Sequence, residues 1–207
     1  MDEQRPARVL TGPHQANGSD ERVLGLFDRE RYEPVEVRID SDGSAGSLRP
    51  GYLLDVDLEW SEPRPHLEDF TLRRPTLYAF ADDVDPVFEV AQDLWEEARA
   101  SGDSMNSRLT RNTDNEVNGV CYVFADSGSA DRLQEFEDGS RPLEPLVDRV
   151  NESDEPAPRE AFVLRPADGA FVVVTIALEK GGHFADTLRE TYDLDRPAEP
   201  LASATHR

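Results

Sequence analysis

Residues 51 to 60 read GYLLDVDLEW, and this stretch decides how the N-terminal half of the chain is interpreted. Apolar and acidic side chains alternate along it, which is the period-two pattern of a β-strand with one buried face and one face in water. Leu54 and Val56 are expected to face a core, and Asp55 and Asp57 to face solvent. The stretch therefore predicts a half-buried strand that needs partners from neighbouring segments.

Similar short apolar runs lie on both sides of this strand. They read RVLGLFD and PVEVRI before it and DFTLRR and TLYAFA after it, with the turn formers SDGSAGS and SEPRP between them. Short strands at such regular spacing are typical of a small barrel or a strongly bent antiparallel sheet. We therefore expect a β-barrel-like domain over residues 1–82.

The hydrophobic period changes after residue 82. The segment DPVFEVAQDLWEEARASG predicts a helix with Asp85 as its N-cap, Pro86 in its first turn and Gly102 at its end. Further helices are expected in SADRLQEFEDG, RPLEPLVDRVNES and HFADTLRETYDL, and strands in NEVNGVCYVFAD and on both sides of the turn PADG.

These patterns predict an α+β protein. A β-barrel or bent antiparallel sheet is followed by a second domain, over residues 83–195, with three antiparallel strands and about four helices. Residues 196–207 are expected to form a flexible tail. Because the join at FADDVDP is short, a single core spanning both parts remains an alternative.

The composition is strongly acidic. The 207 residues include 44 acids and 22 bases, with a formal net charge of -22, and Lys180 is the single lysine. Such a surface is typical of adaptation to molar salt, where repulsion between acids is screened. A DNA-mimicking or cation-buffering role is the weaker alternative, because the acids are spread along the chain. The N-terminus resembles no signal peptide and no apolar run reaches a membrane span, so we expect a cytoplasmic protein.

Signatures of catalysis, cofactors and metals are missing from the sequence. Cys121 is the single cysteine, the four histidines lie far apart, and no phosphate-binding loop or nucleophile elbow is present. With 44 acids, paired carboxylates arise by chance and identify no glycosidase. The sequence therefore predicts no catalytic residue, no cofactor and no metal site.

One stretch departs from the acidic background. Residues 104 to 113, SMNSRLTRNT, hold two arginines and no acid. Arginine forks with Ser, Thr and Asn donors suit phosphate oxygens, so Asn106, Arg108, Arg111 and Asn112 are the candidate anion ligands. In the alternative interpretation SRLTR is a short strand of a hairpin, with its arginines on opposite faces and paired with acids.

Two resemblances add to these patterns. The stretch LRPGYLLDVDLEW followed by LRRPTLYAF resembles the middle strands of small oligonucleotide-binding-type or TRAM-like barrels. More broadly, the RPGYLLDVDLEW strand together with MNSR, NGV and RPLEPLVDRV segments resembles a family of acidic haloarchaeal proteins of unknown function. The second resemblance implies a haloarchaeal, cytoplasmic origin and assigns no activity.

We therefore expect a non-enzymatic module that binds RNA or a nucleotide-like anion through the four ligands above, with Arg73 and Arg74 as a second patch. Tyr52, Trp60, Tyr78 and Phe80 are candidate stacking platforms for bases, although each also suits a core. The main alternative is an interaction or structural adaptor, in which the acid-poor stretch contacts an acidic partner or a second copy of the chain. A hydrolase using Asp114 or Glu116 with a divalent cation ranks last.

Overall fold

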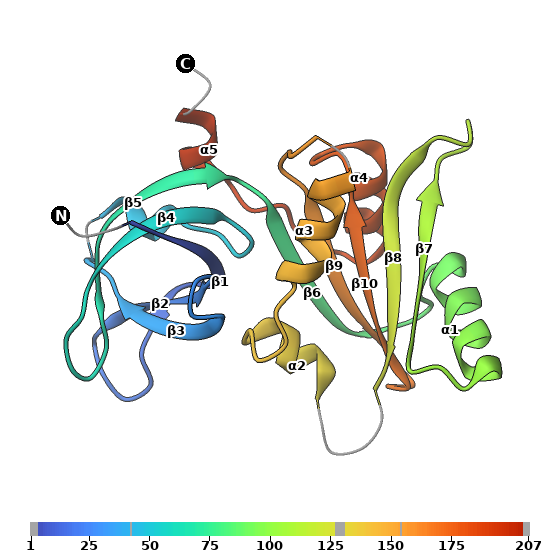
Figure 1. The fold of residues 1–207 in the computed structure, drawn as a ribbon, viewed down its shortest axis with the longest axis horizontal. Helices are drawn as coiled ribbons and strands as arrows, with labels where there is room; N and C mark the ends of the chain where they lie inside the picture. The colour runs from blue at the N-terminus through green and yellow to red at the C-terminus, as the bar shows by residue number, and fades with distance from the viewer. Residues whose placement is uncertain (1–3, 42, 127–130, 154, 205–207) are drawn as a thin grey trace. The chain divides into compact units, whose positions relative to one another are not determined.

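The computed structural model describes residues 4–41, 43–126, 131–153 and 155–204, which form two compact units (Figure 1). The first unit comprises Met1–Leu77, Glu137–Pro142 and Pro197–Arg207. The second comprises Tyr78–Phe136 and Leu143–Arg196. No helix among the described residues is long and apolar enough to cross a lipid bilayer.

The first unit is built on a closed five-stranded barrel with the strand order β1-β2-β3-β5-β4. Its elements are β1 (Arg5–Gln15), β2 (Arg22–Asp28), β3 (Glu33–Arg38), the 3-10 turn η1 (Ser44–Ser47), β4 (Leu53–Glu59) and β5 (His66–Arg74). The barrel closes because β1 pairs with β4, and β3 contacts β5 in a parallel orientation. The prediction of an N-terminal barrel within an α+β fold is confirmed.

The alternation in GYLLDVDLEW is realised in β4. Leu54 and Val56 are buried in the barrel core with Val9 of β1 and Leu24 of β2. Asp55 lies on the other face of the strand, where its carboxylate pairs with Arg73 of β5. The stretch therefore buries its apolar side chains in the barrel core and directs its acids to the opposite, partly exposed face, as the period-two pattern requires.

The second unit contains a five-stranded sheet with the order β6-β9-β10-β8-β7. Its elements are β6 (Leu77–Val84), α1 (Glu89–Ser101), β7 (Met105–Arg111), β8 (Val117–Ala125), α2 (Arg132–Glu137), α3 (Glu144–Ser153), β9 (Glu160–Pro166), β10 (Phe171–Ala177) and α4 (His183–Thr191). One face packs against α2 and α3, and the other against α1 and α4 (Figure 1). Every residue of β10 is buried, because helices cover both faces of this central strand.

The second unit has more strands than the three that the sequence predicts. The run TLYAFA, expected to belong to the barrel, forms most of β6 at one edge of the second sheet. The run MNSRLTR forms β7 at the other edge, as in the alternative interpretation. An alternating pattern predicts that a segment is a strand, but it does not predict which sheet the strand joins, because its partner strand can lie far away in the sequence.

Helix α1 begins later than its sequence suggests. Phe88, not Asp85, is its N-cap, and no side chain caps the helix there. Its predicted end is confirmed, since Gly102 adopts the left-handed conformation (φ 74°) in which glycine has no steric penalty.

The predicted C-terminal tail contains further structure. Helix α5 spans Pro200–Ala204, and the segment before it contacts the barrel. Tyr52 donates a hydrogen bond to Glu199 Oε1 (2.8 Å), and Arg49 Nε donates one to the Ala198 carbonyl (3.0 Å). Burial and the Glu199 contact raise the pKa of the Tyr52 hydroxyl. Residues 196 to 204 are therefore not a simple tail.

Candidate functional site

The acid-poor stretch forms strand β7 and the turn that follows it. Asn112 organises this turn: its Oδ1 accepts hydrogen bonds from the backbone N–H groups of Asp114 (3.0 Å) and Glu116 (2.9 Å). Its Nδ2 donates to the Glu116 carboxylate (3.0 Å), and Asn115 adopts a left-handed φ of 64°. Asn112 therefore stabilises a hairpin turn.

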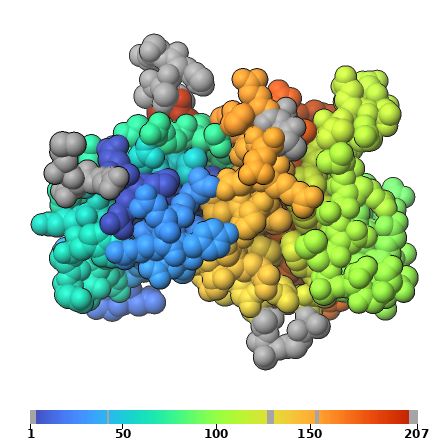
Figure 2. All heavy atoms as spheres, viewed as in Figure 1, coloured from blue at the N-terminus to red at the C-terminus, as the bar shows by residue number. Residues whose placement is uncertain are grey.

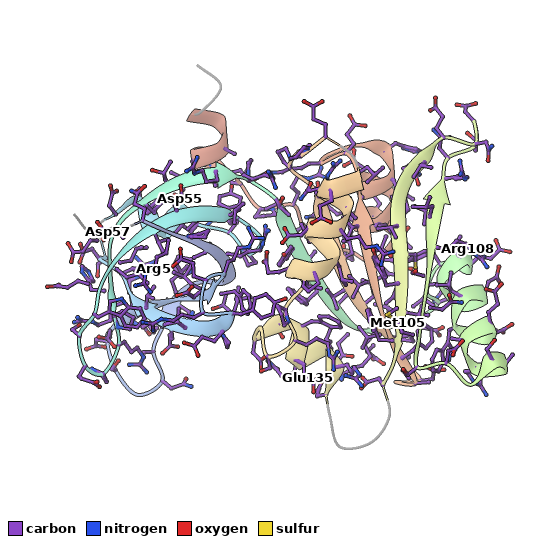
Figure 3. The ribbon with its side chains drawn as sticks, in the orientation of Figure 1. Arg5, Asp55, Asp57, Met105, Arg108 and Glu135 are labelled. Atoms are coloured by element: carbon purple, nitrogen blue, oxygen red, sulfur yellow. The ribbon has the colours of Figure 1, made fainter. Side chains whose placement is uncertain are left out.

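Arg108 and Asn106 lie on the side of the sheet that faces α1. One Arg108 nitrogen donates to both carboxylate oxygens of Glu97, at 2.6 and 2.8 Å, and Asn106 Nδ2 reaches the same carboxylate at 3.5 Å. Met105 and Arg108 are labelled along β7, beside α1, in Figure 3. The structure thus brings these two predicted ligands together around an acid rather than around an open anion site.

The other predicted ligands have different surroundings. Arg111 donates to the Asn115 carbonyl (2.7 Å) and so supports the same turn as Asn112. Arg73 pairs with Asp55, and both Arg73 and Arg74 belong to β5 of the first unit, not to the β7 hairpin. The four ligands predicted in the acid-poor stretch therefore contact Glu97 or support the turn, and the predicted second patch belongs to the other unit.

Of the four candidate stacking aromatics, Trp60 is the exposed one. Tyr52 and Tyr78 are buried, and Phe80 packs against the core of the second sheet. Trp60 follows β4 and is 46% exposed. This exposure makes Trp60 the candidate on which a planar ligand can stack.

Two arginines flank the Trp60 ring. The Arg31 guanidinium carbon lies 4.1 Å from the ring centroid and that of Arg5 lies 5.7 Å from it, within the range of cation–π attraction. Arg5 is labelled at the barrel in Figure 3. An indole beside two guanidinium groups combines a stacking surface with donors for phosphate oxygens.

The turn between β2 and β3 positions Arg31. The buried Asp28 accepts hydrogen bonds through Oδ1 from the N–H groups of Glu30 (2.9 Å) and Arg31 (3.0 Å). Tyr32, the next residue, is 54% exposed and packs edge-on against Phe27 at 5.1 Å between ring centroids. The turn therefore presents a second exposed aromatic beside the arginine.

Among the described residues, the guanidinium groups of Arg5 and Arg31 make only long contacts with carboxylates. Their carboxylate contacts are distant: Arg5 lies 3.8 Å from Asp28 and 4.0 Å from Glu30, and Arg31 lies 4.0 Å from Glu33. Within the described residues neither guanidinium donates a hydrogen bond, whereas Arg108 and Arg111 do. We call Trp60, Arg5, Arg31 and Tyr32 the barrel-end cluster.

Sequence reasoning named Trp60 but missed the rest of this cluster. Arg5 lies at the start of β1, Arg31 in the β2–β3 turn and Trp60 after β4, so only the closed barrel brings them together. The signal available in the sequence is the run RERY, in which two arginines precede an aromatic between two predicted strands. Because Asp28 and Glu33 flank this run, it does not stand out as an acid-poor stretch of the sequence.

Another cluster on the barrel has potential metal ligands. Glu59, His66 and Glu68 each offer a ligand atom, and these atoms lie within 4.8 Å of one another. His66 Nδ1 lies 2.7 Å from Glu68, and Nε2 lies 3.2 Å from Asp40. The hydrogen bond with Glu68 raises the pKa of His66, so an imidazolium can itself supply the positive charge among these acids.

The single cysteine is poorly suited to act as a nucleophile. Burial raises the pKa of the Cys121 thiol to about 11, which leaves it protonated and unreactive at neutral pH. Asp114 and Glu116 lie in the exposed hairpin turn, and they belong to no group of potential metal ligands among the described residues.

Comparison with known proteins identifies a family without an assigned activity. Residues 3–198 match the model of a family of unknown function (DUF6663). No curated protein matches the chain. The family match spans both units, so it concerns the whole architecture and not the barrel alone.

Proposed function

Because the chain belongs to DUF6663, a family of unknown function, we propose from its geometry that it is a non-enzymatic module binding RNA or a nucleotide-like anion. The binding surface is the barrel-end cluster, not the β7 hairpin predicted from the sequence. The observation that carries the proposal is the exposed Trp60 ring, with guanidinium groups at 4.1 and 5.7 Å that donate no hydrogen bond within the described residues.

The chemistry of the cluster suits a base joined to a phosphate. A base can stack on an exposed indole or on the plane of an arginine, and each stacked base contributes about 1–3 kcal/mol. Arg5 and Arg31 then donate to the phosphate oxygens in the forked geometry that favours arginine over lysine. Tyr32, the residue after Arg31, is a second exposed aromatic that a base can contact.

The barrel supports the same proposal. Its closed five-stranded order, with β1 beside β4, supports the resemblance to small oligonucleotide-binding-type barrels. Residues 1–81 are also the less acidic part of the chain, with ten arginines and sixteen acids. We further propose a haloarchaeal, cytoplasmic origin, which the acidic and lysine-poor composition supports. Molar salt would screen the repulsion between the net charge of -22 and a nucleic acid.

Tryptophan fluorescence tests the proposal directly. The chain has two tryptophans, and Trp95 stacks on Phe171 in the second unit, so a Trp95→Phe background reports on Trp60 alone. In molar KCl, a short single-stranded oligoadenylate and adenosine monophosphate are expected to quench the emission saturably. The Arg5→Ala, Arg31→Ala double variant should lose this quenching.

Arg73→Ala provides the matched control, since it removes an exposed arginine of the same barrel that already pairs with Asp55. It should bind like the parent protein. If neither probe changes Trp60 emission, the proposal is wrong. Full competition by inorganic phosphate together with a response to adenosine monophosphate would identify a nucleotide-like anion as the ligand rather than RNA.

A further inference from the structure

Strand β7 ends the second sheet and leaves one edge open. The sheet order places β8 on one side of β7, and no strand of the described chain pairs with its other side. An open edge presents unpaired backbone N–H and C=O groups and is a template for pairing with another chain. Figure 2 shows β7 and β8 at the surface of the second unit.

The hydrogen-bond pattern identifies the residues that face this edge. Ala125 N donates to the carbonyl of Ser104 (2.8 Å), directly opposite it in the register of β7 and β8. Because hydrogen-bonded and non-hydrogen-bonded pairs alternate along an antiparallel ladder, the backbone of Met105, Ser107 and Leu109 points outward. The Ser107 N–H agrees with this, since it donates to Asn106 Oδ1 (2.8 Å) instead of to β8.

The side chains along β7 leave the edge unprotected. Met105 is 48% and Leu109 is 54% exposed, so two large apolar side chains remain in water on one face of the strand. Natural edge strands are commonly protected by charged side chains, especially lysine, by proline or by a bulge. β7 has no lysine or proline, its two arginines are engaged by Glu97 and by the Asn115 carbonyl, and its register shift falls at its far end, between Thr110 and Arg111.

We propose that β7 pairs antiparallel with β7 of a second copy of this chain, about a two-fold axis at Ser107. In this register Met105 of one copy lies opposite Leu109 of the other, so each exposed apolar side chain gains an apolar neighbour. Ser107 lies opposite itself, and the outward backbone groups of all three residues find partners. The two five-stranded sheets then join into one continuous sheet.

The polar and charged residues of β7 also favour this register, with Ser107 on the two-fold axis. Asn106 falls opposite Arg108, close to the Glu97 carboxylate that both side chains already contact. Asp103, just before the strand, falls opposite Arg111. A shift of the axis to Arg108 would instead place Arg108 opposite itself, and like charges in that position are destabilising.

The net charge of the chain favours β7 as the contact surface between two copies. Each copy carries a net charge of -22, and β7 has two arginines and no acid. The strand itself therefore adds no acidic side chain to the contact between two copies. Pairing replaces one hydrogen bond. The Ser107 N–H, which donates to Asn106 Oδ1, must donate instead to the Ser107 carbonyl of the second copy.

Cysteine cross-linking of the full chain in molar KCl tests both the dimer and its register. The native Cys121 is buried and protonated, so an introduced thiol is the reactive one. Opposite residues of a hydrogen-bonded pair lie about 5.5 Å apart at Cα, within the range that a disulfide spans. Ser107→Cys should form a disulfide-linked dimer under mild oxidation.

Met105→Cys and Leu109→Cys extend this experiment. Neither protein should cross-link to itself, whereas a mixture of the two should yield the mixed dimer. If Met105→Cys links to itself as readily as Ser107→Cys, the proposed register is overturned. If none of these proteins cross-links, the edge pairing is overturned as well.

Sedimentation equilibrium provides a test without cysteine. The unmodified chain should approach twice its monomer mass with rising concentration in molar KCl, and Leu109→Asp should remain a monomer. Val117→Asp is the matched control, because Val117 is an exposed apolar residue (37%) on the inner strand β8. A monomer at every concentration, or equal loss of the dimer in both variants, would overturn the proposal.

Discussion

Glu160 is a buried carboxylate with an unusually complete set of partners. Its side chain is 0% exposed; Oε2 accepts from Arg189 Nε (2.6 Å), and Oε1 accepts from the Gly181 N–H and from Arg196, both at 2.9 Å. Arg189 is itself only 6% exposed. A buried charge is tolerated when it is paired and hydrogen-bonded, so this cluster ties β9 to α4 and to the segment after it.

Removal of Arg189 should therefore destabilise the protein strongly. Arg189→Ala leaves the Glu160 carboxylate buried without its closest counter-charge, and breaking such a pair typically costs about 3–5 kcal/mol. Urea unfolding in molar KCl, followed by circular dichroism, measures the free energy of unfolding. Arg196→Ala is the control, since this side chain is 35% exposed and water can replace much of its contact. Equal losses in the two variants would contradict the explanation.

At the residue scale, the sequence predicts side-chain environments better than side-chain partners. The alternation around Leu54 and Val56 is sufficient to predict their burial. The partner of Arg108 could not be predicted, because 44 acids offer too many candidates and α1 decides which of them lies closest. The same limit applies to Trp60 and Arg31, which only the barrel brings together.

At the scale of elements, Gly119 allows β8 to pack closely against its neighbours. A Cβ placed on Gly119 would lie 2.7 Å from Phe184 Cε1 of α4, and 2.8 Å from both the Ile176 carbonyl and Thr110 Oγ1. The Phe184 ring can rotate away, but the carbonyl belongs to the backbone of β10. A side chain at this position would therefore separate strands or displace the helix.

Gly119→Ala is expected to lower the free energy of unfolding by about 1–3 kcal/mol, the usual cost of overpacking a well-packed site. Thermal melts in molar KCl would show the change as a lower transition temperature. Gly12→Ala serves as the control because its nearest neighbours lie 3.8 and 3.9 Å from the added Cβ, an ordinary contact distance. If Gly119→Ala and Gly12→Ala have the same transition temperature, the close packing around Gly119 does not contribute to stability.

The helices and central strands were predictable because their patterns are local. The apolar stripe through Ala91, Leu94 and Ala98 predicts α1, and the continuous apolar run of β10 predicts a strand covered on both faces. The two edge strands were harder to assign. β6 has an ordinary strand pattern but pairs with β9, about 80 residues later, and β7 is too polar to be distinguished from a loop.

At the scale of the whole molecule, net charge should determine the conditions under which the chain folds. The Debye length is about 3 Å in molar salt and about 30 Å at 0.01 M, so repulsion within a chain of charge -22 grows as salt is removed. We expect a cooperative melting transition in molar KCl and its loss in millimolar KCl, as followed by circular dichroism. Uncharged sucrose at the same osmotic strength is the control. An unchanged transition across this range would refute adaptation to high salt.

The first unit is assembled from three separate stretches of chain, and this has a consequence for biosynthesis. Its last stretch, Pro197–Arg207, leaves the ribosome after every residue of the second unit. Until then Tyr52 lacks the Glu199 carboxylate, and Leu201, which packs against the barrel core, is absent. The first unit is therefore the first to begin and the last to be completed: a nascent chain that stops before Pro197 has all five barrel strands and the whole second sheet, but lacks the segment that contacts Tyr52 and the barrel core.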